Sequence, residues 1–246
     1  MLKATVIKRG LFFSTGIMML VIMYLIFMWV PTERNLGVSQ RIFYFHVPIA
    51  WVGFLAFFFV MVGSVGYLGT DLVGRLRYLR WFTRFVSADG WDRLAYSAAE
   101  IGVLFTTLML MSGMVWAKPV WGVWWTWDPR LTTSLILWLI YVAYLMLRAY
   151  SPKGDQGARY AAILGIAGFI DVPLVYLSIV LWRTVHPQAI VGPAGTGDLE
   201  PSMGLLLMIS TLTFTLLFVY LLIDRISLRK SEQEVDMAQG VIELMP

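Results

Sequence analysis

The chain has 246 residues, of which 59% are hydrophobic, 15% aromatic and 14% charged, and its formal net charge is +4. Soluble domains carry about a quarter charged residues, and the apolar residues here fall in blocks of about 20, the length that crosses a bilayer core. The composition therefore excludes a soluble globular domain, and the absence of cysteine excludes disulfides, thiolate metal sites and cysteine nucleophiles.

The first apolar run, residues 11–30, follows a basic stretch with Lys3, Lys8 and Arg9 that resembles the start of a signal peptide. The run is long enough to span and no small-residue cleavage site follows it, so we predict a retained first helix. Further apolar runs at 46–69, 95–116, 133–150, 160–182 and 204–223 complete six predicted membrane helices.

Polar or turn-rich segments separate these runs, at 31–41, 70–93, 117–130, 151–159 and 183–202. We therefore expect an all-α, polytopic membrane protein with one transmembrane domain over residues 1–246. Residues 224–246 are expected to form a cytoplasmic tail, acidic and loosely ordered from residue 231 onward.

The distribution of lysine and arginine predicts the orientation of the helices. One side of the membrane receives fourteen of the 19 basic residues, which places both termini and these loops in the cytoplasm. The basic loops then face anionic lipid, so the net charge gives no case for nucleic-acid binding. The outer side receives the other five: Arg34, Arg41, Lys118, Arg130 and Arg183.

This topology collects three distant parts of the sequence on the outer face. His46 begins the second predicted helix, His186 follows the fifth, and the loop 117–130 joins the third helix to the fourth. These two histidines are the only ones in the chain.

The loop after the third helix is unusually rich in tryptophan. Residues 116–128 hold five of the eleven tryptophans, at positions 116, 121, 124, 125 and 127. Interfacial anchoring explains one or two tryptophans at a helix end, and an aromatic belt remains the structural alternative. The cluster favours a flat, polarisable platform with N–H donors at its edge, suited to a large planar ligand.

The spacing within this loop predicts a short helix. Trp121, Trp124, Trp125 and Asp128 stand at i, i+3, i+4 and i+7, which would align three indoles and a carboxylate on one face. We expect such a helix to lie along the membrane interface between Pro119 and Pro129.

Two histidines at one depth suggest axial ligands of a haem iron, because neutral imidazole commonly fills that role. A lone interfacial histidine with a satisfied hydrogen bond is the alternative for either one. Haem propionates need cationic partners, and Arg41, Lys118, Arg130 and Arg183 surround the two histidines and the loop. Planar bidentate recognition favours Arg41 and Arg130 among them, whereas snorkelling at helix ends explains at least one of the four.

Two carboxylates fall inside predicted helices. Asp171 lies near the middle of the fifth, just before Pro173, and Glu100 lies in the first part of the third. Ionisable groups at membrane depth often belong to proton or substrate paths. Both could equally be neutral, or bonded to backbone groups freed by Pro173.

Several stretches resemble one family of haem-handling membrane proteins. They are RIFYFHVP at 41–48, SGMVWAKPVWGVWWTWDPRLT at 112–132, VPLVYLS at 172–178, Trp182, and the pair His186 and Pro187. Together with the length and the six spans, they resemble the cytochrome c maturation protein C family, also called haem exporter protein C. Asp171 departs from that pattern, in which an amide is typical.

The resemblance implies a protein of the bacterial inner membrane that presents haem b at the periplasmic surface. It implies iron ligation by His46 and His186, and a platform of Trp121, Trp124, Trp125, Trp127 and Asp128 with Arg130 beside it. It also implies delivery to a membrane-tethered haem chaperone for cytochrome c maturation, and association with a small single-span subunit and an ABC-type transporter.

Such a protein binds and delivers haem and is not an enzyme. A membrane electron-transfer protein of the cytochrome b kind is one alternative, but it usually needs histidines at depth within the helices. A haem permease or exporter is another, with Asp171 and Glu100 in its path. Permeases are often longer and built from repeated halves, which this sequence lacks. Haem-lyase-associated relatives with the same tryptophan motif are longer, with more spans.

Overall fold

The computed structural model describes residues 2–73, 87–151, 155–182 and 199–243. Helices dominate these residues, and apart from one isolated bridge between Glu33 and Gly37 they contain no β-structure. In chain order the elements are α1 (Leu2–Tyr24), the π-helical turn η1 (Leu25–Trp29), the 3₁₀ turn η2 (Val38–Ile42), α2 (Phe43–Val73), α4 (Ala88–Trp121), α5 (Pro129–Tyr150), α6 (Asp155–Phe169), α7 (Asp171–Leu181) and α8 (Pro201–Glu243).

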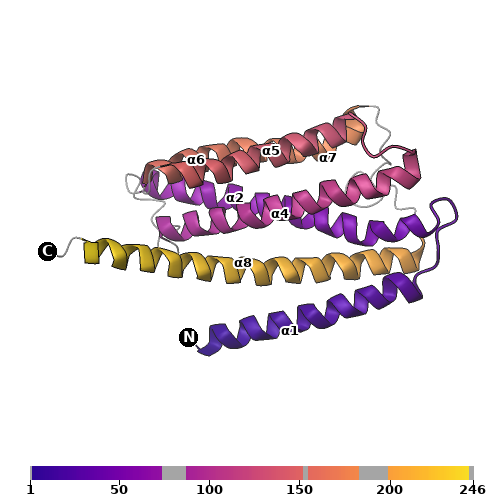
Figure 1. Cartoon of the computed structure of the whole chain (residues 1–246), viewed down its shortest axis with the longest axis horizontal. Helices are drawn as coiled ribbons and strands as arrows, with labels where there is room; N and C mark the ends of the chain where they lie inside the picture. The colour runs from indigo at the N-terminus through magenta and orange to yellow at the C-terminus, as the bar shows by residue number, and fades with distance from the viewer. Residues whose placement is uncertain (1, 74–86, 152–154, 183–198, 244–246) are drawn as a thin grey trace.

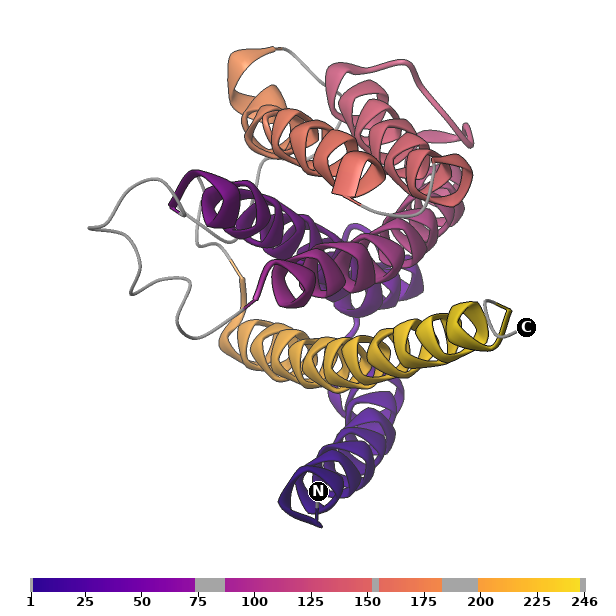
Figure 2. The same cartoon turned by 90° about the vertical axis from the view of Figure 1, so that its left-hand side faces the viewer.

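The helices lie side by side in one bundle, with α2 and α4 at its centre (Figures 1 and 2). Helices α5, α6 and α7 cover one side of this pair, and α8 covers the other. Helix α1 lies outermost and packs mainly against α8. The start of α1 and the end of α8 lie toward the end of the bundle opposite the tryptophan loop.

The six predicted membrane helices are confirmed. Among the residues that the structure describes, six helical segments are long and apolar enough to cross a bilayer, with α6 and α7 together forming the fifth. The third is longer than predicted, because α4 begins at Ala88, where the Ser87 hydroxyl accepts a hydrogen bond from the Gly90 amide, and continues to Trp121.

The fifth span is broken at Ile170, where α6 ends and α7 begins. Pro173 has no amide hydrogen, and its ring would clash with the carbonyl of Phe169 in a continuous helix. The amide of Ile170 bonds instead to the carbonyl of Ala167, one residue closer than in an α-helix. Asp171 therefore begins a helix rather than lying within one.

The central pair packs closely through small residues, which let two membrane helices approach. A Cβ atom on Gly63 of α2 would lie 2.9 Å from the backbone nitrogen of Ala95 on α4. Further along, Phe57 of α2 stacks on Tyr141 of α5 at 3.7 Å between ring centroids. These contacts fix α2 against α4 and α5, the helices that carry the candidate site.

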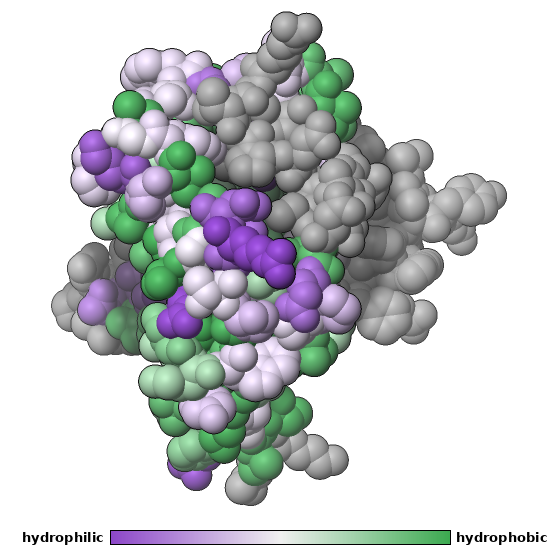
Figure 3. All heavy atoms as spheres, turned by 90° about the vertical axis from the view of Figure 1, so that its right-hand side faces the viewer, coloured by the Kyte–Doolittle hydropathy of each residue, from purple (hydrophilic) through white to green (hydrophobic). Residues whose placement is uncertain are grey.

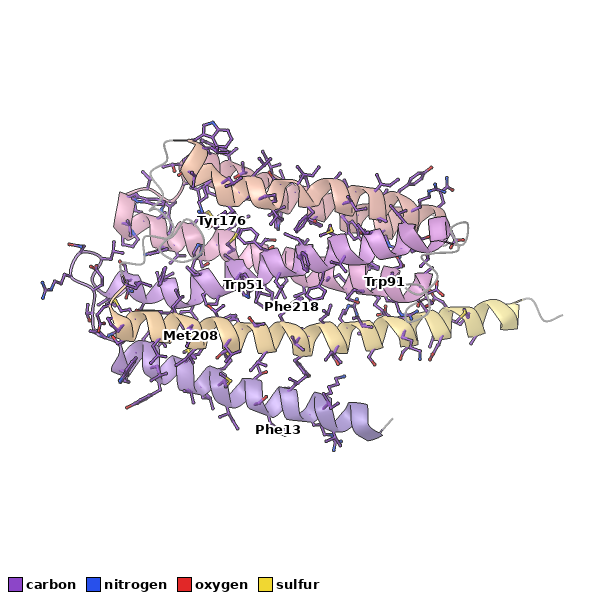
Figure 4. All side chains as sticks on the ribbon, turned by 180° about the vertical axis from the view of Figure 1, so that it is seen from behind. Phe13, Trp51, Trp91, Tyr176, Met208 and Phe218 are labelled. Atoms are coloured by element: carbon purple, nitrogen blue, oxygen red, sulfur yellow. The ribbon has the colours of Figure 1, made fainter. Side chains whose placement is uncertain are left out.

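The packing of α8 contrasts with that of α1. Figure 4 labels Trp51 and Phe218 where α2 faces α8, and Trp51 Nε1 donates to Thr215 Oγ1 at 3.1 Å. Phe218 is fully buried, whereas Phe13 on α1 is exposed. The exposed apolar surface of α1 is suited to contact with lipid.

The expectation of a loosely ordered tail from residue 231 is wrong for residues 231–243. Helix α8 continues without interruption to Glu243, well past the apolar run that ends near residue 223. Its polar part is anchored to α4, because Arg93 donates to Gln233 at 2.9 Å and Arg229 donates to Glu100 at 2.5 Å.

Candidate functional site

His46 lies in the first turn of α2, and its side chain contacts one face of α4. Its Nδ1 lies 2.9 Å from the hydroxyl oxygen of Ser112, and its ring centroid lies 5.8 Å from that of Trp116. A Cβ atom on Gly113 would approach His46 Cε1 to 3.2 Å, so glycine at 113 lets the imidazole lie directly on the helix.

The imidazole lines a small cavity of about 70 Å³ between α2, α4, α5 and α7. Ligand pockets for drug-sized molecules usually measure about 300–1,000 Å³. The cavity therefore cannot enclose a large planar ligand, and such a ligand could reach His46 only from the mouth. The wall is mostly apolar, with Phe54, Met109 and Val175 among its residues, and it includes the guanidinium-bearing Arg130.

The predicted short helix over residues 121–128 is wrong. Helix α4 includes Pro119 and ends at Trp121, where Gly122 adopts a left-handed conformation (φ 76°) and its amide bonds to the Lys118 carbonyl. Glycine adopts this conformation without the steric cost that a Cβ adds, which makes it a common helix terminator. Helix α5 begins at Pro129, so the residues between form an extended loop.

Asp128 closes this loop as the N-cap of α5. Its Oδ1 accepts a hydrogen bond of 2.8 Å from the amide of Leu131, and Pro129 occupies the first helical position. Both features favour helix initiation. The predicted alignment of the Asp128 carboxylate with three indoles on one helical face is therefore absent.

The tryptophans divide into two groups. Trp116 and Trp121, both on α4, line the cavity beside His46. Trp124 and Trp127 are exposed, at 56% and 74%, and Trp125 lies edge-on to Trp127 with 5.6 Å between ring centroids. Figure 3 views this end of the bundle, where hydrophilic residues interrupt the apolar surface.

The cations that were predicted to bind the haem propionates differ in their contacts. Arg130 shares the cavity with His46. Lys118 donates to the Gly122 carbonyl at 2.8 Å and lies 5.9 Å from the Trp124 ring, so it supports the loop. The Arg41 guanidinium lies over Phe27, 5.9 Å from the ring centroid. Arg183 and His186 lie outside the described residues.

Two indole N–H groups lie buried at this end of the bundle. The Nε1 atoms of Trp116 and Trp125 are buried, and neither has a hydrogen-bond partner among the residues that the structure describes. Unpaired buried donors are uncommon and costly, which suits a ligand that supplies oxygen acceptors. The site thus combines an imidazole, apolar and aromatic walls, a guanidinium and unused N–H donors, a set that fits haem.

Sequence reasoning missed Ser112 and Gly113. Both belong to the stretch that carries the family resemblance, but their contact with His46 joins residues 66 positions apart and no local pattern reveals it. The spacing offers one signal, because Ser112 and Trp116 are one helical turn apart and so share a face of α4.

Comparison with known proteins identifies the family of the chain. The family model of heme exporter protein C matches residues 2–240. The chain is 37% identical over 191 residues to a protein of that name from Bradyrhizobium diazoefficiens, an alignment that covers 78% of this chain and 66% of the relative. It is 34% identical over 195 residues to the Escherichia coli protein, covering 76% and 72% of the two chains.

A third relative of the same name, from Haemophilus influenzae, is 32% identical over 196 residues, which cover 79% of this chain and 73% of the relative. The match to the family model spans α1 to the polar part of α8, and so includes His46, Ser112 and the whole tryptophan loop. By sequence and by its six apolar helices, this chain is a member of the heme exporter protein C family.

Proposed function

We propose that this protein binds haem b at the outer face of the bacterial inner membrane and delivers it for cytochrome c maturation. The observation that carries the proposal is the placement of His46 in a mostly apolar cavity beside Trp116 and Arg130. The names of the relatives, heme exporter protein C, support haem as the cargo.

In this proposal His46 and His186 would be the two residues that ligate the haem iron. Haem supplies an iron with two axial positions and two propionate carboxylates. The Ser112 contact occupies Nδ1 of His46, so Nε2 would be the nitrogen available to the iron. The two histidines are the entire imidazole complement of the chain, so one haem uses both.

The tryptophans would support the flat face of the haem, and the cations would bind its carboxylates. Trp116 and Trp121 lie nearest His46, and the exposed rings of Trp124 and Trp127 extend the aromatic surface outward together with Trp125. Arg130 is the cation best supported for a propionate, because it lines the same cavity as His46. Arg41 and Lys118 are further candidates for binding a propionate, and Arg183 stays a prediction because it lies outside the described residues.

The small volume of the cavity favours delivery over storage. Because about 70 Å³ cannot enclose a porphyrin, one edge of the bound ring would stay accessible from outside the bundle. An accepting protein could then contact the haem before His46 releases it. We infer that the acceptor is a membrane-tethered periplasmic haem chaperone, and that a small single-span subunit and an ABC-type transporter complete the assembly.

The proposed role is delivery, not catalysis, and the alternatives lack support from the site. A permease path through Glu100 is disfavoured, because that carboxylate binds Arg225 and Arg229 in an ion-pair network. An electron-transfer protein needs histidines spread through the membrane depth, and both histidines are predicted at one face.

The test is the optical spectrum of the purified full chain, with haem added in detergent. We expect a low-spin, bis-histidine spectrum that is weakened by His46→Ala and by His186→Ala. Trp51→Phe serves as a control, because it alters an indole near α8 and leaves the cavity intact. An unchanged spectrum in both histidine variants would overturn the ligand assignment.

A further inference from the structure

We propose that Ser112 is a positioning residue that fixes His46 in the tautomer with its proton on Nδ1, so that Nε2 carries the lone pair. The inference rests on the proposed function in one respect: it assigns Nε2 of His46 as the atom that meets the haem. It adds a residue on α4 that selects the form of the imidazole before haem arrives.

The hydroxyl of Ser112 has one proton and two close carbonyl neighbours. Its oxygen lies 2.7 Å from the carbonyl oxygen of Leu108 and 3.2 Å from that of Met109. A carbonyl can only accept, so a separation of 2.7 Å requires the hydroxyl to donate to Leu108. This back-bond to residue i−4 is a usual arrangement for serine within a helix.

With that proton committed, Ser112 can meet His46 only as an acceptor. The contact of 2.9 Å between Nδ1 and the serine oxygen therefore needs a proton on Nδ1. If Nδ1 carried a lone pair instead, either it would face the lone pairs of the serine oxygen or the Leu108 bond would be lost. A neutral imidazole with Nδ1–H has its remaining lone pair on Nε2, which can then bind a metal.

The surroundings hold the ring in this orientation. Trp116 follows Ser112 by one turn of α4 and lies beside the imidazole, while Gly113 leaves the space that Cε1 occupies. Ser112, Gly113 and Trp116, all on α4, thus hold the imidazole in this orientation. Metal-binding histidines are commonly supported in this way by a second hydrogen bond, which fixes the tautomer and raises the basicity of the ligand.

The first experiment uses haem-free protein. The full chain with His186→Gln retains His46 as its single histidine, and ¹⁵N-labelled histidine distinguishes a protonated ring nitrogen from a bare one by NMR. We expect the proton on Nδ1 in this background. Adding Ser112→Ala should transfer much of that population to Nε2–H, and Ser112→Thr should restore Nδ1–H because its hydroxyl can repeat both contacts.

The second experiment uses haem-loaded protein. Ser112→Ala should weaken haem affinity about 10–100-fold, the range seen when the supporting partner of a metal-bound imidazole is removed. It should also raise the iron reduction potential, since a less basic imidazole stabilises the ferric state less. Ser112→Thr should leave both near wild type. Thr211→Ala is the matched control, because it removes an equivalent back-bond, to Leu207, on α8.

The outcomes separate this inference from the proposed function. If His46→Ala leaves the haem spectrum unchanged, the ligand assignment fails whatever Ser112 does. If His46→Ala abolishes the spectrum while Ser112→Ala keeps the wild-type tautomer, affinity and potential, the positioning role alone is overturned. A proton on Nε2 of His46 in the haem-free protein with Ser112 intact would also overturn it.

Discussion

Arg225 of α8 binds the carboxylate of Glu100 on α4 through two hydrogen bonds, from Nε to Oε2 at 2.6 Å and from Nη2 to Oε1 at 2.8 Å. Arg229 adds a third bond to Oε1 at 2.5 Å, and its guanidinium lies 3.8 Å from the centroid of the Tyr96 ring. The paired side chains are only 20–27% exposed. This network joins α8 to the centre of the bundle, and it indicates a structural role for Glu100.

Glu100→Gln should therefore destabilise the protein without affecting haem. The substitution leaves two arginines facing a neutral amide, and we expect the free energy of unfolding to fall by about 2 kcal/mol. Denaturation of the detergent-solubilised protein measures this change. Glu234→Gln is the control, because its pair with Lys230 spans 3.8 Å on an exposed surface and should contribute less than about 0.5 kcal/mol. Loss of haem binding at full stability would contradict this assignment.

Substitutions of Asp128 can distinguish the role of its negative charge from its role as the N-cap of α5. Because its carboxylate caps α5, Asp128→Ala should lower stability by about 1 kcal/mol, whereas Asp128→Asn should retain the cap and most of the stability. We expect haem affinity to follow the same order, since the cap fixes one end of the tryptophan loop. Thermal unfolding and haem titration of both variants provide the measurement. Weak haem binding by a stable Asp128→Asn variant would show that the charge itself is needed.

Gly113→Ala should separate helix stability from ligand binding. Alanine favours a helix over glycine by about 0.5–1 kcal/mol, but the new methyl group would lie 3.2 Å from His46 Cε1 and displace the ring. We expect about tenfold weaker haem binding, the lower end of the range for disturbed support of a metal-bound imidazole. Gly16→Ala on α1 meets nothing within 4 Å and should leave haem titration unchanged. Equal affinities for the two variants would argue against close packing at position 113.

Asp171→Asn should be nearly silent for cytochrome c maturation. Asp171 is 9% exposed, and its Oδ2 is buried without a hydrogen-bond partner among the described residues. A charge there is unfavourable, so a neutral amide should preserve or raise stability. Asp92→Asn is the matched control, because Asp92 pairs with Arg148 at 2.7 Å and its loss should destabilise the protein. A severe maturation defect in a stable Asp171→Asn variant would assign a function to the charge.

The membrane helices could be predicted from the sequence because a span is a local property. About 20 consecutive apolar residues suffice to identify one, whatever its neighbours are. His46 lies at the start of the second helix, as its place in the apolar pattern predicts. The break at Ile170 is local too, since Pro173 causes it, yet the apolar run through residues 160–182 concealed it.

The partners of the site could not be predicted, because they depend on contacts between helices. Glu100 meets Arg225 across 125 residues, and nothing near either residue indicates which helix lies beside it. The short helix predicted for the tryptophan loop is absent for a different reason. The spacing from Trp121 to Asp128 fits one helical face, but the terminator at Gly122 and the cap at Asp128 outweigh that periodicity.

The length of α8 has a mechanical consequence. At 1.5 Å per residue its 43 residues extend about 65 Å, roughly twice the thickness of a bilayer core. About half of this helix must therefore extend beyond the hydrocarbon layer. The contacts of Arg225, Arg229 and Gln233 with α4 attach the start of this part to the bundle. A force on the polar end of α8 would be transmitted to the packing of α8 against α4, because the membrane-embedded half restrains rotation of the helix.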